Sequence, residues 1–337
     1  MQTRRQFISG SISDTDSLSL AKPSDSLLIT ASRSAMAGEF EIDLNANQYP
    51  QGMECSLDAL DEVTRLDEKL SFFRPNSVTS YLNVVAKTEA VEVDDEVFGF
   101  VRECVVLWRE TGGAFDITAA PLWETWGFAR RDGRLPSDTE ISNALDAVCC
   151  GAIELDESAK TIRFRDERLR LNFGAVGKGF AIDAAGRTLL AGGIDDFLIH
   201  GSFSSILANG TQHNTNNESG WQVGIAHPLK RGQRLREIRL HNVAVGTSGT
   251  QQQFFVHRGK RYGHIIDPRT GQPSDSLIGV TVIAPTAMLA DALSTAFFVM
   301  GPDATIEYCE NHENIKALIT IPVKKGGGYE IVEVGEI

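Results

Sequence analysis

Apolar residues recur at every third or fourth position in several stretches, a spacing that places them on one face of an α-helix. Residues 57–73 form the first such stretch, which stops before the helix-breaking Pro75. A second covers residues 97–108. A third opens with Ser137 and Glu140, which are spaced as in a capping box. The same reasoning predicts later helices over residues 181–190, 286–300 and 304–311.

Between these helices, apolar runs and alternating polar and apolar residues predict β-strands. Three strands, over residues 152–155, 161–165 and 169–173, follow one another closely enough to form a β-meander. Residues 280–284 have the composition of a strand buried on both faces. The other predicted strands cover residues 28–30, 40–44, 197–200, 206–208, 221–225, 238–240, 243–245, 254–256, 262–266, 317–321 and 329–334.

The composition is that of a soluble globular protein, with 42% hydrophobic and 23% charged residues among 337. A net charge of -13 argues against a general nucleic-acid binder. The five cysteines form no C-x-x-C pair, so we expect buried, reduced thiols and no disulfide framework. The absence of an H-E-x-x-H motif argues against a zinc hydrolase. No apolar run approaches the roughly 18 residues that a transmembrane helix needs.

The N-terminal segment is polar and carries an arginine pair. Residues 3–8, Thr-Arg-Arg-Gln-Phe-Ile, look like a twin-arginine export signal, but residues 9–17 are too polar for the apolar region that such a signal contains. The motif is therefore either a signal remnant or a chance match. We expect residues 1–26 to be a disordered segment and residues 27–337 to be the folded unit.

Residues 262–273 combine a histidine, an aspartate, two prolines and two glycines. The β-branched residues Ile265 and Ile266 indicate the end of a strand, and the Pro and Gly that follow indicate a tight turn. A stiff turn that holds His264 beside Asp267 suits proton transfer or phosphate recognition. A polar hairpin end fits the same residues.

Two further patterns carry candidate chemistry. The glycine-rich residues 174–180 lie between a strand and a helix, where Lys178 suits a bound phosphate, although tight packing alone explains the glycines equally well. Asp291 and Thr295 are four residues apart on one helix, and their oxygens suit a hard cation such as Mg²⁺. A solvent-facing pair is the alternative.

Taken in order, these segments resemble the family of FAD:protein FMN transferases, the ApbE flavin transferases. The most specific match is His264-Ile265-Ile266-Asp267-Pro268-Arg269-Thr270-Gly271-Gln272-Pro273. The resemblance covers about residues 27–321. Its other segments are Met36-Ala37-Gly38, residues 71–83, Phe115 to Leu122 with Trp126-Gly127-Phe128, Gly177 to Asp183, Val280 to Ala284, and Ala290 to Ala296.

The resemblance implies an α+β, T-fold-like architecture with mixed or antiparallel sheets, flanking helices and FAD between two lobes. It implies Mg²⁺-dependent cleavage of FAD, with FMN joined by a phosphoester to a Ser or Thr of an acceptor protein and AMP released. The twin-arginine-like motif without an apolar region predicts a cytoplasmic protein, whereas the resemblance implies a periplasmic or membrane-associated one.

The resemblance also assigns roles to particular residues. His264 is implied as the base for the acceptor hydroxyl. The implied Mg²⁺ ligands are Asp291, Thr295 and the backbone carbonyl of Ala175. The implied FAD contacts are Met36, Asp116, Lys178, Asp183, Ser248, Gly249, His264, Ile265 and Asp267, with Asp183 and Asp267 either holding the flavin or orienting neighbours.

The chain departs from the family pattern at three places: Gly201-Ser202-Phe203, Thr250 to Gln253, and Asn172. From these departures we expect Phe203 to crowd the flavin or the acceptor. They also leave two alternatives open beside the transferase: a protein that binds or stores FAD, and an FAD pyrophosphatase that has lost transfer to protein.

Overall fold

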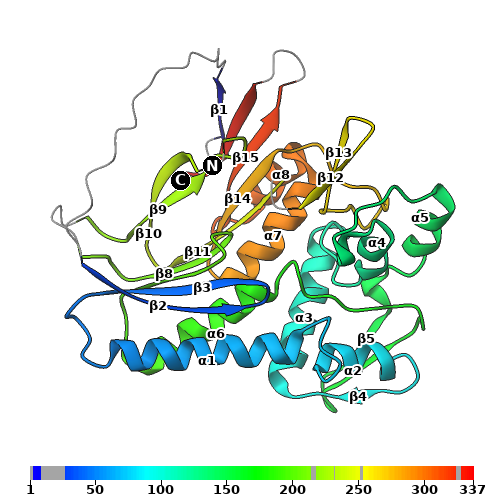
Figure 1. Cartoon of the computed structure of the whole chain (residues 1–337), viewed down its shortest axis with the longest axis horizontal. Helices are drawn as coiled ribbons and strands as arrows, with labels where there is room; N and C mark the ends of the chain where they lie inside the picture. The colour runs from blue at the N-terminus through cyan, green and yellow to red at the C-terminus, as the bar shows by residue number, and fades with distance from the viewer. Residues whose placement is uncertain (1–2, 9–26, 214–217, 231, 251–252, 324–327) are drawn as a thin grey trace.

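The computed structural model describes residues 3–8, 27–213, 218–230, 232–250, 253–323 and 328–337, and its centre is one large antiparallel sheet. In this part of the chain the sheet has nine strands in the order β1-β16-β15-β14-β11-β8-β7-β3-β2 (Figure 1). The strands in this order are Thr3–Ile8, Tyr329–Val334, Lys316–Pro322, Gly279–Ala284, Val243–Gly249, Ser205–Asn209, Phe197–Gly201, Gly38–Asn45 and Leu28–Ala35.

Helices α1 (Gly52–Leu70), α6 (Gly177–Ala191), α7 (Ala287–Met300) and α8 (Pro302–Asn311) pack on one face of this sheet (Figure 1). The ribbon of β9 (Trp221–Ala226) and β10 (Arg234–Leu240) covers residues from β8, β14 and β15 in a second hydrophobic cluster. Every residue of β14 is buried, as expected for a strand that is covered on both faces.

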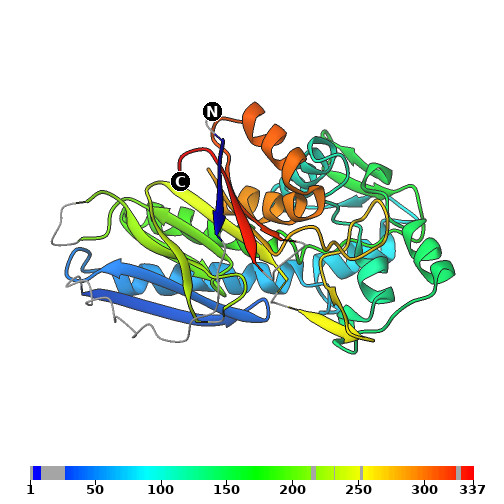
Figure 2. The ribbon, with the colours of Figure 1, turned by 90° about the horizontal axis from the view of Figure 1, so that it is seen from above.

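The second lobe is smaller and mostly helical, and it lies at one end of the molecule in both views (Figures 1 and 2). It holds α2 (Val78–Val85), α3 (Asp95–Glu110), α4 (Ala120–Thr125), α5 (Asp138–Leu145) and the short helices η1 (Phe128–Arg130) and η2 (Cys150–Ala152). Its small sheet has the strand order β4-β6-β5, formed by Val91–Glu92, Thr161–Phe164 and Ile153–Asp156. The hairpin of β12 (Phe254–His257) and β13 (Lys260–Gly263) lies beside α4 and η1.

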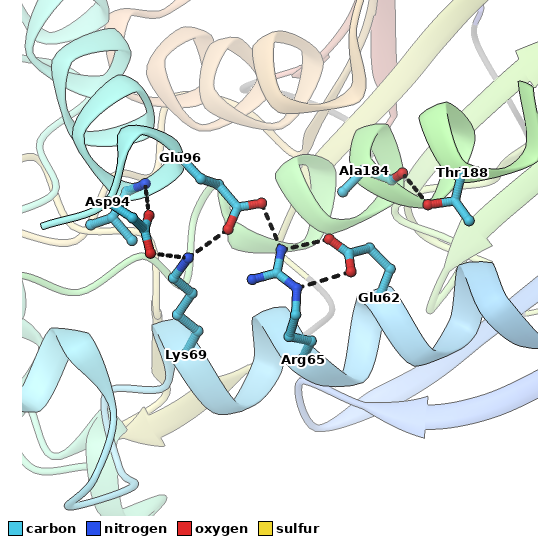
Figure 3. Close-up of polar contacts among 8 residues, drawn as sticks. Glu62, Arg65, Lys69, Asp94, Glu96, Ala184 and Thr188 are labelled. Atoms are coloured by element: carbon cyan, nitrogen blue, oxygen red, sulfur yellow. Dashed lines mark hydrogen bonds and ion pairs between the residues drawn. The ribbon is translucent and has the colours of Figure 1, made fainter. Parts of the chain in front are cut away.

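An ion-pair network joins α1 to the start of α3 and so connects the two lobes (Figure 3). Lys69 Nζ lies 2.6 Å from Asp94 Oδ2 and 2.7 Å from Glu96 Oε2, and Arg65 bridges Glu62 and Glu96. Burial raises the pKa of Asp94 and of Glu96, but their basic partners prevail, so both carboxyl pKa values are lowered. The network therefore favours the ionised carboxylates at neutral pH.

The α+β class, with antiparallel sheets and flanking helices, is confirmed, and so is the capping box of α5 at Ser137 and Glu140. The predicted strand over residues 169–173 is wrong, because β4 occupies the edge of β6 where a third meander strand would pair. The Asn83 side chain instead bonds the backbone of Leu171, donating to its carbonyl and accepting from its N–H.

The N-terminus differs from the expected disorder over residues 3–8, which form β1 and pair with β16. Without β1, strand β16 would be an edge strand with unpaired backbone groups, and residues 3–8 hydrogen-bond to those groups. Residues 9–26 lie outside the described part of the chain. The cysteines are free, although Cys149 is exposed and Cys55 is half-buried. No helix in the described residues has the length and apolarity required to cross a membrane.

Gly246 in β11 sets how closely α7 approaches the sheet, which generates a stability prediction. A Cβ atom at this position would lie 2.3 Å from the carbonyl oxygen of Ala290. Gly246→Ala should therefore lower the free energy of unfolding by about 2–3 kcal/mol, measured by urea denaturation. Gly99→Ala, in α3 with no atom within 4 Å of the new methyl group, is the control and should be neutral or stabilising. Equal stability of the two variants would contradict this account.

Candidate active site

Two cavities meet where the two lobes join. The larger, of about 680 Å³, is lined by Met36, Arg131, Ser202, Gln253, the hairpin residues Phe254 and Phe255, and others. The smaller, of about 280 Å³, is lined by Phe73, Asp116, Trp123, Ala175, Asp291, Thr295 and others. Lys178, Ser204 and His264 border both cavities. Together the two spaces have the size of sites that hold cofactor-sized ligands.

Helices α6 and α7 cap each other's N-termini, and this pairing positions the candidate metal ligands. Asp291 of α7 accepts a hydrogen bond from the backbone N–H of Gly179 in α6 at 2.8 Å. Asp183 of α6 accepts from the N–H groups of Ala287 and Met288 in α7 at 2.8 and 2.9 Å. Each carboxylate thus satisfies backbone donors that a helix leaves without a partner.

The contact at Gly179 is too tight for any other residue. A Cβ atom there would lie 2.2 Å from the carbonyl oxygen of Ala287. Glycine lets the first turn of α6 approach α7, and it brings Lys178 to the junction of the cavities. The glycine-rich loop therefore serves tight helix packing and site formation together.

Asp291 is 5% exposed, and burial raises its pKa to about 6, although the Lys178 charge and the Gly179 N–H oppose the rise. Thr295 and Ala175 line the same cavity, so all three implied metal ligands are brought together. Among the described residues, no group of three or more His, Cys, Asp or Glu side chains could hold a metal. A cation site here would rely on one carboxylate and neutral oxygens.

The orientation of His264 follows from its hydrogen bonds. Its Nδ1 lies 3.1 Å from the carbonyl oxygen of Gln253, and its backbone N–H donates to the same oxygen. A carbonyl only accepts, so Nδ1 carries the proton and Nε2 is left with its lone pair. Burial lowers the pKa of His264, the bond to Gln253 opposes this, and the charge of Lys178 lowers it further. The ring is therefore a neutral base at pH 7.

Asp116 organises the wall of the smaller cavity. Its Oδ1 accepts from the backbone N–H and the hydroxyl of Thr118, at 2.7 and 2.5 Å, and its Oδ2 accepts from the N–H of Cys150. Burial raises the pKa of Asp116 against these hydrogen bonds. The Asp116 carboxylate therefore stabilises the surrounding loops through these hydrogen bonds, and it also lines the cavity.

The other implied FAD contacts divide into two groups. Met36, Lys178, Ser248 and Ile265 border one or both cavities. Asp183, Gly249 and Asp267 border neither. Asp183 caps α7, and Asp267 forms an ion pair with Arg269 at 2.9 Å, so both orient neighbouring residues. Gly249 ends β11 opposite Gly279.

The departures from the family pattern have clear structural places. Phe203 is 75% exposed, stacks on His200 with ring centroids 4.6 Å apart, and borders neither cavity, so it does not crowd the site. Asn172 Oδ1 accepts from the N–H of Gly174 and supports the glycine-rich loop. Gln253 orients His264, while residues 251–252 lie outside the described part of the chain.

Sequence reasoning missed the aromatic wall of the larger cavity. Phe255 stacks on Tyr262 and contacts Trp126 and Phe128, which anchors the hairpin to the second lobe. Trp126 also donates its indole N–H to the carbonyl of Gly271 at 2.9 Å. The density of aromatic residues around Trp126 was a signal of packing, but the partner strand was not identifiable from spacing.

The buried Asp291 carboxyl generates a prediction about pH and stability. The Asp291 carboxyl has a pKa of about 6 in the folded chain and a lower pKa in the unfolded chain. At a pH between these two pKa values, the group is therefore protonated in the folded state and ionised in the unfolded state. This contribution to stability is full below pH 4 and is lost as pH rises through 6, by about 3 kcal/mol in total. Asp291→Asn should therefore flatten the fall in unfolding free energy between pH 4 and 7, measured by denaturant titration. An unchanged pH profile would contradict this.

Comparisons with known proteins show the family and the fold of the chain. The ApbE family model matches residues 36–319. The FAD:protein FMN transferase of Haemophilus influenzae is 27% identical over 335 residues, which cover 96% of this chain and 95% of the relative. That of Escherichia coli K12 is 30% identical over 274 residues, covering 78% and 75%.

A solved structure agrees with these relatives. The ApbE protein of Thermotoga maritima superposes with a TM-score of 0.80 at 27% identity, covering 90% of this chain and 96% of that one. The region matched by the family model begins at Met36 and includes Asp291 as well as Lys178, Ser204 and His264, which border both cavities. The chain belongs to the ApbE family.

Proposed function

We propose that this protein is a Mg²⁺-dependent FAD:protein FMN transferase that joins FMN by a phosphoester to a Ser or Thr of an acceptor protein. The observation that carries the proposal is the neutral His264 ring, which lies at the junction of two cavities and near the Lys178 charge. The Gln253 carbonyl is bonded by Nδ1, which leaves Nε2 with its lone pair. The relatives named FAD:protein FMN transferase support this reading.

The chemistry is a phosphoryl transfer in which atoms and charges balance. The acceptor hydroxyl oxygen forms a bond to the FMN phosphorus, the bond from that phosphorus to the bridging oxygen breaks, and AMP leaves. The hydroxyl proton moves to His264 Nε2 and later to solvent. Such a transfer depends on positioning and charge neutralisation more than on covalent help from the protein.

Residues of the first lobe meet the negative charge of the pyrophosphate. The Lys178 ammonium belongs to the first turn of α6, where the N-terminal end of a helix also favours an anion. Its charge acts on both Asp291 and His264, so it lies among the reacting groups. This local cation matters because the whole chain carries a net charge of -13.

The donor set of the smaller cavity fits Mg²⁺. Asp291, Thr295 and the Ala175 carbonyl supply only hard oxygen atoms, which this ion prefers, and few protein ligands leave positions for phosphate oxygens. When bound, Mg²⁺ would neutralise charge on the phosphate oxygens. A cation also favours the ionised form of a carboxyl whose pKa burial raises to about 6.

The central test uses mass spectrometry of a purified candidate acceptor incubated with the protein, FAD and Mg²⁺. We expect the acceptor to gain the mass of one FMN phosphoester while AMP appears in equal amount. FAD that binds without AMP or labelled acceptor would indicate a binding or storage protein. AMP and free FMN without labelled acceptor would indicate a pyrophosphatase.

His264→Gln should reduce the transfer rate by about 10²–10⁴-fold, the range for loss of a general base, while FAD affinity changes little. In the wild-type protein, the rate should rise with pH along a limb that lies below about 6.5, because only the neutral ring accepts the proton and its pKa is lowered. The matched control is His257→Gln, which changes an exposed histidine in the same hairpin. Equal losses in both variants would remove His264 from the mechanism.

The metal assignment predicts a change in thermal stability that does not depend on turnover. Mg²⁺ added with FAD at pH 7.5 should raise the Tm of the wild-type protein by several degrees, since a ligand at about 100 times its Kd contributes about 2.7 kcal/mol. Asp291→Asn should lose the Mg²⁺-dependent part of this shift. The shift should also shrink at pH 5, where protons compete for the carboxylate. A full Mg²⁺ shift in the Asn variant would contradict the assignment.

A further inference from the structure

The β12–β13 hairpin carries positive charge in an acidic protein. Arg258, Lys260 and Arg261 lie at or beside its tip, and Arg131 of the second lobe borders the larger cavity, which Phe254 and Phe255 of the hairpin also border. All four side chains are exposed. Within the described residues, none of the four forms an ion pair with an acidic group. With a net charge of -13 on the whole chain, this cationic hairpin is a local reversal of sign.

The two faces of the hairpin differ in chemistry. The inner face holds Phe255 and Tyr262, which stack with ring centroids 5.1 Å apart and pack against Trp126. The outer face leaves Phe254 45% and Val256 61% exposed. The anchored inner face makes the hairpin a fixed element, while the outer face presents apolar surface next to cationic groups. That combination is typical of a protein-binding surface.

The hairpin leads directly into the reacting groups. β13 ends at Gly263, and the next residue is His264. Phe254 and Phe255 border the larger cavity, which His264 and Lys178 also border. In the described chain the two strands pair only with each other, so each offers an open edge to an extended segment. A chain that lies along the hairpin would therefore pass the mouth of the cavity.

We propose that this hairpin, together with Arg131, docks an acidic segment of the acceptor protein that flanks the modified Ser or Thr. The inference rests on the proposed transferase function and adds the chemistry of the partner. Charge complementarity favours this occupant: Arg258, Lys260 and Arg261 attract Asp and Glu side chains, while the chain as a whole carries a net charge of -13. An anionic membrane would meet the same charges, but it could not enter the cavity beside His264.

The test measures binding apart from transfer. The probe is a fluorescent peptide with a central Thr flanked by Asp and Glu, compared with the same peptide carrying Asn and Gln. Arg258→Asp together with Lys260→Glu reverses the charge at the tip, and Asp tolerates the positive φ of 50° at position 258. Lys87→Glu with Arg163→Glu is the control, because it makes the same charge change at exposed positions of the second lobe outside the hairpin.

The full-length wild-type protein should bind the acidic peptide at least 10-fold more tightly than the neutral peptide. The hairpin variant should lose about 10-fold of this affinity, the control variant should retain it, and higher salt should weaken wild-type binding. FAD affinity and Tm should be the same in all three proteins.

Equal affinity of the wild-type protein and the hairpin variant for the acidic peptide would overturn the proposal. So would an equal loss in the control variant, or hairpin-dependent binding to vesicles containing phosphatidylserine without peptide binding. The proposed function fails separately: hairpin-dependent peptide binding without FMN transfer to any acceptor would leave the docking surface standing and remove the transferase.

Discussion

The reciprocal capping of α6 and α7 is the interaction on which the site depends. Asp183 and Asp291 exchange hydrogen bonds with each other's helices, so neither helix can shift without leaving buried N–H groups unpaired. Gly179 and Gly246 make the contact possible by admitting α7 against α6 and β11. Burial raises the pKa of both carboxyl groups to about 6, which shows that their place is costly for the charged form. A cation in the adjoining cavity would relieve that cost at Asp291 by favouring the ionised carboxylate.

Most of the fold could be predicted from the periodicity of the sequence. α1 has a clear apolar face and the Ser137–Glu140 capping box fixes the start of α5, so local rules sufficed there. The strand expected over residues 169–173 shows the limit of such rules, because Asn83 from a distant helix bonds the backbone that a strand partner would have taken. Residues 3–8 show the opposite error: a polar segment becomes a strand because β16 offers it an edge.

The residues of the candidate site that could take part in chemistry were predictable from the sequence. The residues that position them were less predictable. Lys178, His264, Asp291 and Thr295 stand in recognisable segments, and the structure brings them to shared cavities. The role of Gln253 was not predictable. Its backbone carbonyl fixes the His264 tautomer, and every residue type has such a carbonyl, so the sequence does not indicate which one bonds the ring. Phe203 was misjudged for a related reason: its sequence neighbours border the cavity, but the turn directs its ring outward onto His200.

The distribution of charge ties these observations together. An enzyme that handles a pyrophosphate gains from positive groups at the reaction centre, yet this chain is strongly acidic. Some of its cations stand close to the proposed chemistry: Lys178 lies at the junction of the cavities, and Arg258, Lys260 and Arg261 lie on the hairpin that ends beside His264. Because the field of a small cluster is screened within about 8 Å at physiological salt, each cluster acts only on what lies next to it. The hairpin cations therefore act on a segment that lies along the hairpin, and Lys178 acts on a group inside the cavities.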